Sequence, residues 1–226
     1  MRLSILVACT IICSALAAEE QPRRIDAAVD LGGGKAYLFT GSRYSRFDLG
    51  AGATDSGYPM AIDQRSWPGL PWTEGIDAAV TYNNGKVYLL KGGEYVRFDV
   101  KADRVDPGYP KPINQRTWSG LPWTSGIDAA VNGGNGKVYL FRGAEYVRFD
   151  IQADRVDAGY PKPIDQASWP GLPWASVDAA LEGGSGKLYL FKGGQYVRFD
   201  IAADRVEAGY PKPIDQATWP GLDIRR

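Results

Sequence analysis

The sequence contains no histidine. This absence removes the side chain that most often serves as a general base, as a zinc ligand and as a haem ligand. The only two cysteines, Cys9 and Cys13, lie close to the N-terminus. A Ser-His or Cys-His nucleophile is therefore excluded, and the chain beyond Cys13 has no disulfide and no cysteine metal ligand.

Neither sign of charge is in excess. The 26 Lys and Arg residues balance 26 Asp and Glu residues. A protein that binds nucleic acid or an anionic membrane needs a surplus of basic groups to neutralise phosphates. The composition therefore predicts that neither nucleic acid nor a membrane is a partner.

The N-terminus has the pattern of a secretory signal peptide. Met1-Arg2 is a short basic start, Leu3 to Leu16 is apolar and uncharged, and Ala15-Leu16-Ala17 has the small-x-small pattern of a cleavage site. An apolar stretch this short does not span a membrane. We expect residues 1–17 to be a signal peptide and residues 18–24 to form an N-terminal segment.

A second interpretation of this region is a lipoprotein signal. Leu6-Val7-Ala8-Cys9 resembles a lipoprotein cleavage motif, but cleavage there leaves almost no hydrophobic region before the cysteine. The signal-peptide interpretation is preferred, and it predicts a secreted, extracellular protein. Such a chain, without cysteines, must be held together by its core alone.

One unit of about 50 residues occurs four times. Ile25-Asp26-Ala27-Ala28-Val29 recurs at residues 76–80 and 127–131, and in a variant form at 177–181. A fixed repeat of this length indicates a solenoid, a propeller or another array. The units fill the chain beyond the leader, so no second domain is expected. Their bounds are 25–72, 73–123, 124–174 and 175–226.

Each unit parses into four strands, shown here for the second one. The Asp-Ala-Ala segment is the first strand, and Asn84-Gly85 is a hairpin turn that leads to a second strand at Lys86 to Leu90. Tyr95 to Asp99 forms the third strand and Arg104-Val105-Asp106 a short outer one. Pro112 to Trp118 is long enough for one or two helical turns.

The second and third strands are apolar or aromatic on both sides of the pleat. Such strands must be covered on both faces, and four-stranded sheets stacked radially provide that cover. An open solenoid would need atypical capping units, whereas the first and last units here are close to the consensus. We therefore predict an all-β, four-bladed β-propeller with four antiparallel strands per blade and a short helix after the outer strand.

The innermost strands of a propeller present one backbone edge to the central channel, where their polar groups need partners. Alternate carbonyls of a strand point the same way, so two rings of main-chain oxygens are expected. Oxygen ligands without nitrogen or sulfur select a hard cation such as Ca²⁺ or Na⁺. Carboxylates are alternative ligands, and a water-filled channel with turn-capping aspartates is the other interpretation. The predicted rings are Asp26, Asp77, Asp128 and Asp178, and then Ala28, Ala79, Ala130 and Ala180.

Three other residue types recur in each unit. The tryptophans are interpreted as framework residues rather than a carbohydrate-stacking site. The arginines either form an anion-binding ring or pair with nearby aspartates, and the tyrosines before proline anchor turns, although tyrosine is also a haem ligand. These sets are Trp67, Trp118, Trp169 and Trp219; Arg46, Arg97, Arg148 and Arg198; and Tyr58, Tyr109, Tyr160 and Tyr210.

The motifs Asp-Ala-Ala, Tyr-Leu-Phe-Lys-Gly, Tyr-Val-Arg-Phe-Asp, Gly-Tyr-Pro and Trp-Pro-Gly-Leu-Pro occur in this order. Together they resemble the hemopexin-like repeat, from about Asp26 to Leu222. The resemblance implies ions stacked in the channel (Ca²⁺ or Na⁺, with Cl⁻ as a further ion) and held by main-chain atoms of the Asp and Ala positions above. It is greatest to stand-alone four-repeat proteins, the hemopexin-type plant albumins and bacterial photopexins. Such albumins are associated with polyamine and haem binding.

The chain departs from this family pattern in three ways. Animal members usually join the first and last blades by a disulfide, which this chain cannot form. Haem here would have no histidine ligand, and the His-Glu-x-x-His motif of the metalloproteinases that carry this module is absent. Closure is therefore expected to depend on packing and on the channel ion.

Two function classes remain. One is a small-ligand binder, with a cation or a polyamine at the channel mouth. The other is a protein-interaction module that contacts a secreted partner through a blade face, the rim or the irregular segment from Gly50 to Ser56. We do not expect an enzyme, because every prominent aspartate recurs in all four units and catalytic groups rarely follow fold symmetry.

Overall fold

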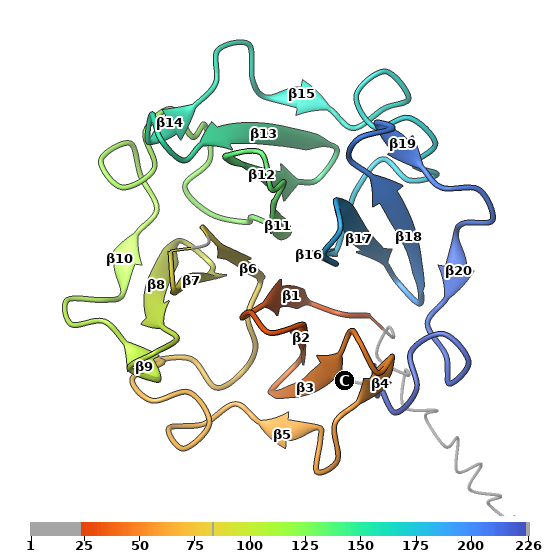
Figure 1. Cartoon of the computed structure of the whole chain (residues 1–226). Coiled ribbons are helices and arrows are strands. Elements are labelled where there is room, and N and C mark those ends of the chain that lie inside the picture. The colour runs from red at the N-terminus through yellow and green to blue at the C-terminus, as the bar shows by residue number, and fades with distance from the viewer. Residues whose placement is uncertain (1–23, 83, 225–226) are drawn as a thin grey trace, which may run out of the picture.

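The computed structural model describes residues 24–82 and 84–224. In this part of the chain four sheets stand around a central axis, so the predicted four-bladed all-β propeller is confirmed (Figure 1). The predicted signal peptide at 1–17 lies outside the described residues. No helix in the described part is long and apolar enough to cross a membrane.

Each blade begins at the axis with a four-residue inner strand and continues outward through two six-residue strands. All neighbouring pairs are antiparallel. The inner strands are β1 (Ala27–Asp30), β6 (Ala78–Thr81), β11 (Ala129–Asn132) and β16 (Ala179–Glu182). The second strands are β2 (Lys35–Thr40), β7 (Lys86–Lys91), β12 (Lys137–Arg142) and β17 (Lys187–Lys192). The third strands are β3 (Arg43–Asp48), β8 (Glu94–Asp99), β13 (Glu145–Asp150) and β18 (Gln195–Asp200).

The outer edge of each blade consists of two short strands rather than one. Both pair with the third strand, one near its end and the other near its start. The first set is β4 (Ala53–Thr54), β9 (Arg104–Val105), β14 (Arg155–Val156) and β19 (Arg205–Val206). The second set is β5 (Met60–Ala61), β10 (Lys111–Pro112), β15 (Lys162–Pro163) and β20 (Lys212–Pro213). The prediction of four strands per blade missed this second set.

The predicted short helix after the outer strand is wrong, because the described residues form only a turn there. In the second blade the N–H of Trp118 donates to the carbonyl of Asn114 at 2.8 Å, which closes a single turn. Gly120 then takes a left-handed φ of 78°, and its N–H donates to Oε1 of Gln115 at 2.9 Å. This glutamine bond and the glycine conformation end the turn before a helix can continue.

The core lies between the blades, as the two-sided apolar strands predict. Each of its four clusters combines residues of two neighbouring blades. The framework tryptophans are central to them: the rings of Trp67 and Phe98 on the next blade are 5.0 Å apart, and those of Trp118 and Phe149 are 5.3 Å apart. These contacts bury large aromatic surfaces and fix the spacing of the blades.

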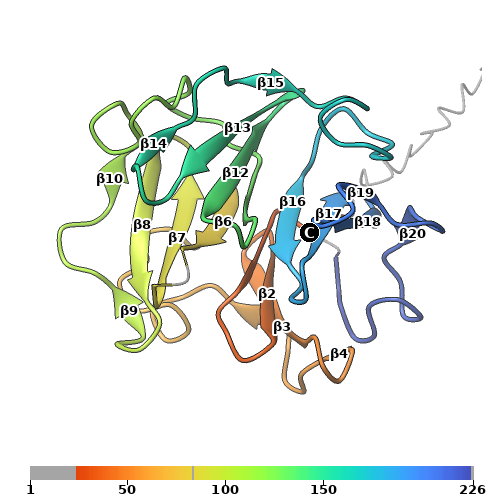
Figure 2. The ribbon, with the colours of Figure 1, turned by 45° about the horizontal axis from the view of Figure 1, so that its top comes forward.

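The ring closes between the last and first blades, which lie side by side in both ribbon views (Figures 1 and 2). The inner strands β1 and β16 contact each other just as consecutive inner strands do. Trp219 packs on Phe47 with ring centroids 4.7 Å apart. The last and first blades are therefore joined by the same tryptophan-phenylalanine contact as the other neighbouring blades. Packing thus closes the propeller, as expected for a chain that cannot form the disulfide.

Candidate functional site

The inner strands bring all eight predicted site residues to the axis. The four aspartates precede the strands and line a cavity of about 400 Å³ at one mouth of the channel. The four alanines line a much narrower cavity of about 10 Å³, which has room for a single small ion or water at most. The two predicted rings therefore occupy successive levels of one channel. Ion binding by their main-chain oxygens stays a prediction.

The carboxylates of the aspartate ring are occupied by turns. The carboxylate Oδ2 accepts a hydrogen bond from the backbone N–H of the glycine between the second and third strands of the same blade. The donor-acceptor pairs are Gly41–Asp26 at 2.7 Å, Gly92–Asp77 at 2.7 Å, Gly143–Asp128 at 2.6 Å and Gly193–Asp178 at 2.8 Å. The turn-capping interpretation thus holds for the side chains.

Basic side chains contact the other carboxylate oxygen at three of these aspartates. Nε of Arg24 lies 2.9 Å from Oδ1 of Asp26, and Nζ of Lys192 lies 2.6 Å from Oδ1 of Asp178. A longer pair, 3.9 Å, joins Lys91 to Asp77. These ion pairs lower the negative charge at the wide mouth and leave the backbone oxygens as the more available cation ligands.

The opposite end of the channel breaks the fourfold pattern. The last residues of the inner strands are Asp30, Thr81, Asn132 and Glu182, which all line the narrow cavity. Nδ2 of Asn132 donates to the carbonyl of Thr81 at 2.9 Å, and its Oδ1 accepts from Gly134 N–H at 2.8 Å. The part of this channel end formed by Thr81 and Asn132 is therefore neutral and hydrogen-bonded.

The other side of that end is acidic. Burial raises the pKa of Asp30 and of Glu182, and the negative charge of Asp30 raises the pKa of Glu182 further. Within residues 24–82 and 84–224, neither carboxylate forms an ion pair with a basic side chain. This pair was not among the predicted site residues, because it does not recur: the same repeat position holds four different polar residues.

A metal in this channel would depend on main-chain oxygens. Among the described residues, no group of three or more His, Cys, Asp or Glu side chains is arranged to hold a metal ion. The chemistry of the donor set, backbone and carboxylate oxygens on a fourfold axis, fits a hard cation such as Ca²⁺ or Na⁺.

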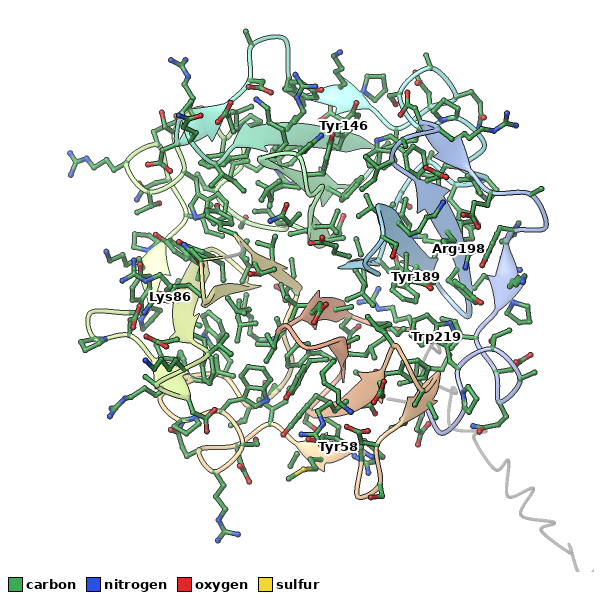
Figure 3. The ribbon with its side chains drawn as sticks, in the orientation of Figure 1. Tyr58, Lys86, Tyr146, Tyr189, Arg198 and Trp219 are labelled. Carbon is green, nitrogen blue, oxygen red and sulfur yellow. The ribbon has the colours of Figure 1, made fainter. Side chains whose placement is uncertain are left out.

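The recurring arginines form ion pairs, which favours the pairing interpretation over an anion-binding ring. Nε of Arg148 lies 2.5 Å from Oδ2 of Asp157, and Arg97 pairs with Asp106 in the same way. Each of these guanidinium groups also lies over a tyrosine ring, 5.4 Å away for Arg148 over Tyr160. Figure 3 shows Arg198 on the last blade, where its partner is Glu207.

All four repeats match the model of a known protein family. A family model described as Hemopexin matches residues 25–71, 76–122, 127–173 and 177–222. Vitronectin of Oryctolagus cuniculus is 38% identical over 151 residues, which are 62% of this chain and 29% of vitronectin. Stromelysin-2 of Rattus norvegicus is 38% identical over 108 residues, 47% of this chain and 21% of that protein. The chain thus spans less than a third of these two relatives.

A solved structure extends the match to the whole propeller. The crystal structure of a plant albumin from Cicer arietinum, described as showing hemagglutination, has a TM-score of 0.76 and 25% sequence identity. The match covers 88% of this chain and 96% of the albumin.

Proposed function

This chain belongs to the hemopexin family, and we propose that it is a secreted, non-catalytic binding protein with a hard cation, Ca²⁺ or Na⁺, in its central channel. In this proposal a small cationic ligand such as a polyamine binds at a channel mouth. Export is supported by the signal-peptide pattern of residues 1–17, which lie outside the described part of the chain.

The observation that carries this proposal is the pair of carboxylates at the narrow end of the channel. Asp30 and Glu182 line the same small cavity as the four alanines, and both have a raised pKa because burial disfavours their charged forms. A bound cation would offset this cost, since an opposite charge within a few ångströms stabilises a carboxylate. Main-chain oxygens of the alanine ring, which lines the same cavity, would supply further ligands to this ion, and those of the aspartate ring would form a second level of the channel.

A polyamine fits the same electrostatics. Protonated amines are attracted by carboxylates and carbonyl oxygens, the groups that also attract Ca²⁺. The wide mouth, with its cavity of about 400 Å³, accommodates part of a flexible chain, and Asp128 there has its carboxylate at the surface. Polyamine and metal ion would therefore compete for the channel.

Titration calorimetry tests this proposal. Spermine is titrated into chelator-treated protein and then into the same protein with excess CaCl₂. We expect binding that calcium weakens at least tenfold, and that Asp128→Asn at the wide mouth also weakens, whereas the control Glu145→Gln on the exposed start of β13 leaves it unchanged. Spermine binding that is indifferent to calcium and to Asp128→Asn would contradict a ligand site in the channel.

A second candidate function is contact with another secreted protein through the rim of the first blade. Met60 is 43% exposed there, at a position where the other blades have Lys111, Lys162 and Lys212. An apolar side chain at an otherwise basic rim position suits a protein partner. In a pull-down from the native secretion, capture of a partner protein should then be lost with Met60→Lys and unaffected by chelation. Capture that is lost on chelation and kept with Met60→Lys supports the channel function instead.

A further inference from the structure

A cavity lies between the third and fourth blades, away from the channel. It measures about 520 Å³, within the range of small-molecule sites. Its walls include the aromatic residues Tyr139, Tyr146, Trp169 and Phe199 beside polar ones, and Lys162 and Asp204 are exposed at its rim. Tyr146 is labelled on the third blade in Figure 3. The proposed channel function does not use this cavity.

The equivalent space between the second and third blades is filled by a side chain of the protein itself. Tyr82 follows the inner strand β6, and its ring stacks on Tyr88 with centroids 4.3 Å apart. It also packs edge-on against Trp118 at 6.2 Å and beside Phe149 at 6.4 Å. These three partners occupy the same repeat positions as Tyr139, Trp169 and Phe199, the walls of the empty cavity.

The third blade has a glycine where the second has the tyrosine ring. Gly133 follows β11 at the repeat position of Tyr82, and Gly183 has this position in the fourth blade. A Cβ on Gly133 would lie only 2.6 Å from Cε2 of Tyr139, so the ring of Tyr139 lies against the glycine. No side chain at this position therefore packs on the aromatic walls of the cavity as Tyr82 does at the preceding interface.

The carboxylate near the Tyr82 hydroxyl has an equivalent at the cavity between the third and fourth blades. Burial raises the pKa of the Tyr82 hydroxyl well above its usual value, and the neighbouring Tyr88 and Asp154 raise it further. Asp204, at the repeat position of Asp154, lines the cavity and has the same left-handed backbone, with φ of 49° against 51°. A hydroxyl on a ring bound as Tyr82 is would lie near this carboxylate. The first blade has Gly52 at this position, so the glycine and the carboxylate occur together only at the interface between the third and fourth blades.

We propose that the cavity between the third and fourth blades binds a small planar aromatic molecule that carries a hydroxyl group. Its ring stacks on Tyr139 and packs against Trp169 and Phe199, as Tyr82 does on the equivalent residues of the preceding interface. Its hydroxyl donates to Asp204. The volume admits a ligand larger than a single phenol ring.

The test uses two probes: p-cresol, which is the tyrosine side chain as a free molecule, and the larger 2-naphthol. Calorimetry measures the stoichiometry, and NMR chemical-shift changes in the full chain locate the site. We expect one equivalent to bind the wild-type protein. Gly133→Tyr installs the ring of the second blade and should raise Kd at least tenfold. Tyr82→Gly opens the equivalent cavity and should raise the stoichiometry to two, whereas Tyr82→Phe keeps the ring and should leave it at one.

The role of the hydroxyl is tested separately. Asp204→Asn should weaken p-cresol binding severalfold and leave toluene binding unchanged. The proposal is overturned if the wild-type protein binds neither phenol at millimolar concentration, or if folded Gly133→Tyr binds as well as wild type. If Gly133→Tyr does not fold, a stoichiometry of one for Tyr82→Gly overturns it instead.

Discussion

The backbone N–H of Thr54 on the first blade donates a 2.9 Å hydrogen bond to the carbonyl of Pro220 on the last blade. The same bond joins Val105 to Pro68, Val156 to Ser119 and Val206 to Pro170, each at 2.9 Å. The closing interface is thus equivalent to the three interfaces between consecutive blades. Closure needs no covalent link, because the last and first blades are joined by the same contacts as any two consecutive blades.

This equivalence predicts how core substitutions at different interfaces compare. Trp219→Ala at the closing interface should lower the free energy of unfolding by roughly 3–5 kcal/mol, as removal of a buried tryptophan does elsewhere. Trp118→Ala, at an interface between consecutive blades, should cost about the same. Urea unfolding of both variants measures this. A much smaller cost for Trp219→Ala would mean that the ring is open in solution.

The acidic pair at the narrow end of the channel predicts a stabilising substitution. Burial and the charge of Asp30 raise the pKa of Glu182, so the ionised form destabilises the fold at neutral pH. Glu182→Gln should therefore raise the melting temperature of calcium-free protein by roughly 2–4 °C, which corresponds to about 1 kcal/mol in a domain of this size. The gain should disappear at acidic pH, where Glu182 in the wild-type protein is itself protonated.

Calcium should reverse the order of stability of the wild-type protein and Glu182→Gln. In saturating CaCl₂ the wild-type protein should gain more stability than Glu182→Gln, because only the wild type has the full negative charge for the ion. Glu145→Gln, on an exposed residue, serves as the control and should respond as the wild type does. Equal calcium responses in all three proteins would remove Glu182 from the ion site.

Acid should destabilise the outer faces of the blades. Lys35 donates to Asp48 and lowers the pKa of that carboxyl to about 2, and Lys86 lowers the pKa of Asp99 in the second blade. A carboxyl with a lowered pKa contributes stability at neutral pH that is lost as the pH falls through its folded-state pKa. We expect the melting temperature to fall between about pH 4 and pH 2, and Lys86→Gln should make that fall shallower. If the melting temperatures of the wild-type protein and Lys86→Gln fall equally between about pH 4 and pH 2, these ion pairs are not the cause of the acid destabilisation.

The choice between backbone and carboxylate ligands can be tested at Asp128. Asp128→Asn keeps an oxygen that can accept the Gly143 N–H bond and removes the charge. If main-chain oxygens hold the ion, calcium affinity should fall less than tenfold, whereas loss of a direct carboxylate ligand should cost far more. Ala130→Val, at a buried channel position, should block the ion by bulk while Asp128→Asn does not.

The recurring residues made most of the fold predictable. The predicted strand at Lys86 to Leu90 differs by one residue from β7 (Lys86–Lys91), because Val, Tyr and Leu between glycine turns specify a strand locally. The short helix was a wrong prediction, since its length alone was considered and the bonds of Asn114 and Gln115 that end the turn were not. The two-residue strand at Lys111–Pro112 was missed because a proline can supply no N–H to a ladder.

The candidate sites were predictable only where they follow the repeat. The Asp and Ala positions converge on the axis because each inner strand begins at the same point of its unit. Asp30 and Glu182, and the exchange of Tyr82 for Gly133, lie at positions where the units differ. Such residues contribute nothing to a consensus, and their proximity across blades becomes visible only when the ring is closed.

The most direct test of the proposed channel site is the intact mass of the folded protein, purified from its native secretion and measured by native mass spectrometry. A cation in the channel predicts a mass excess that matches calcium or sodium and disappears with Asp128→Lys, and a calcium excess that also disappears with chelation. An additional excess that matches a polyamine would identify the ligand. A bare mass, together with a melting temperature that calcium and spermine leave unchanged, would contradict an ion or ligand site in the channel.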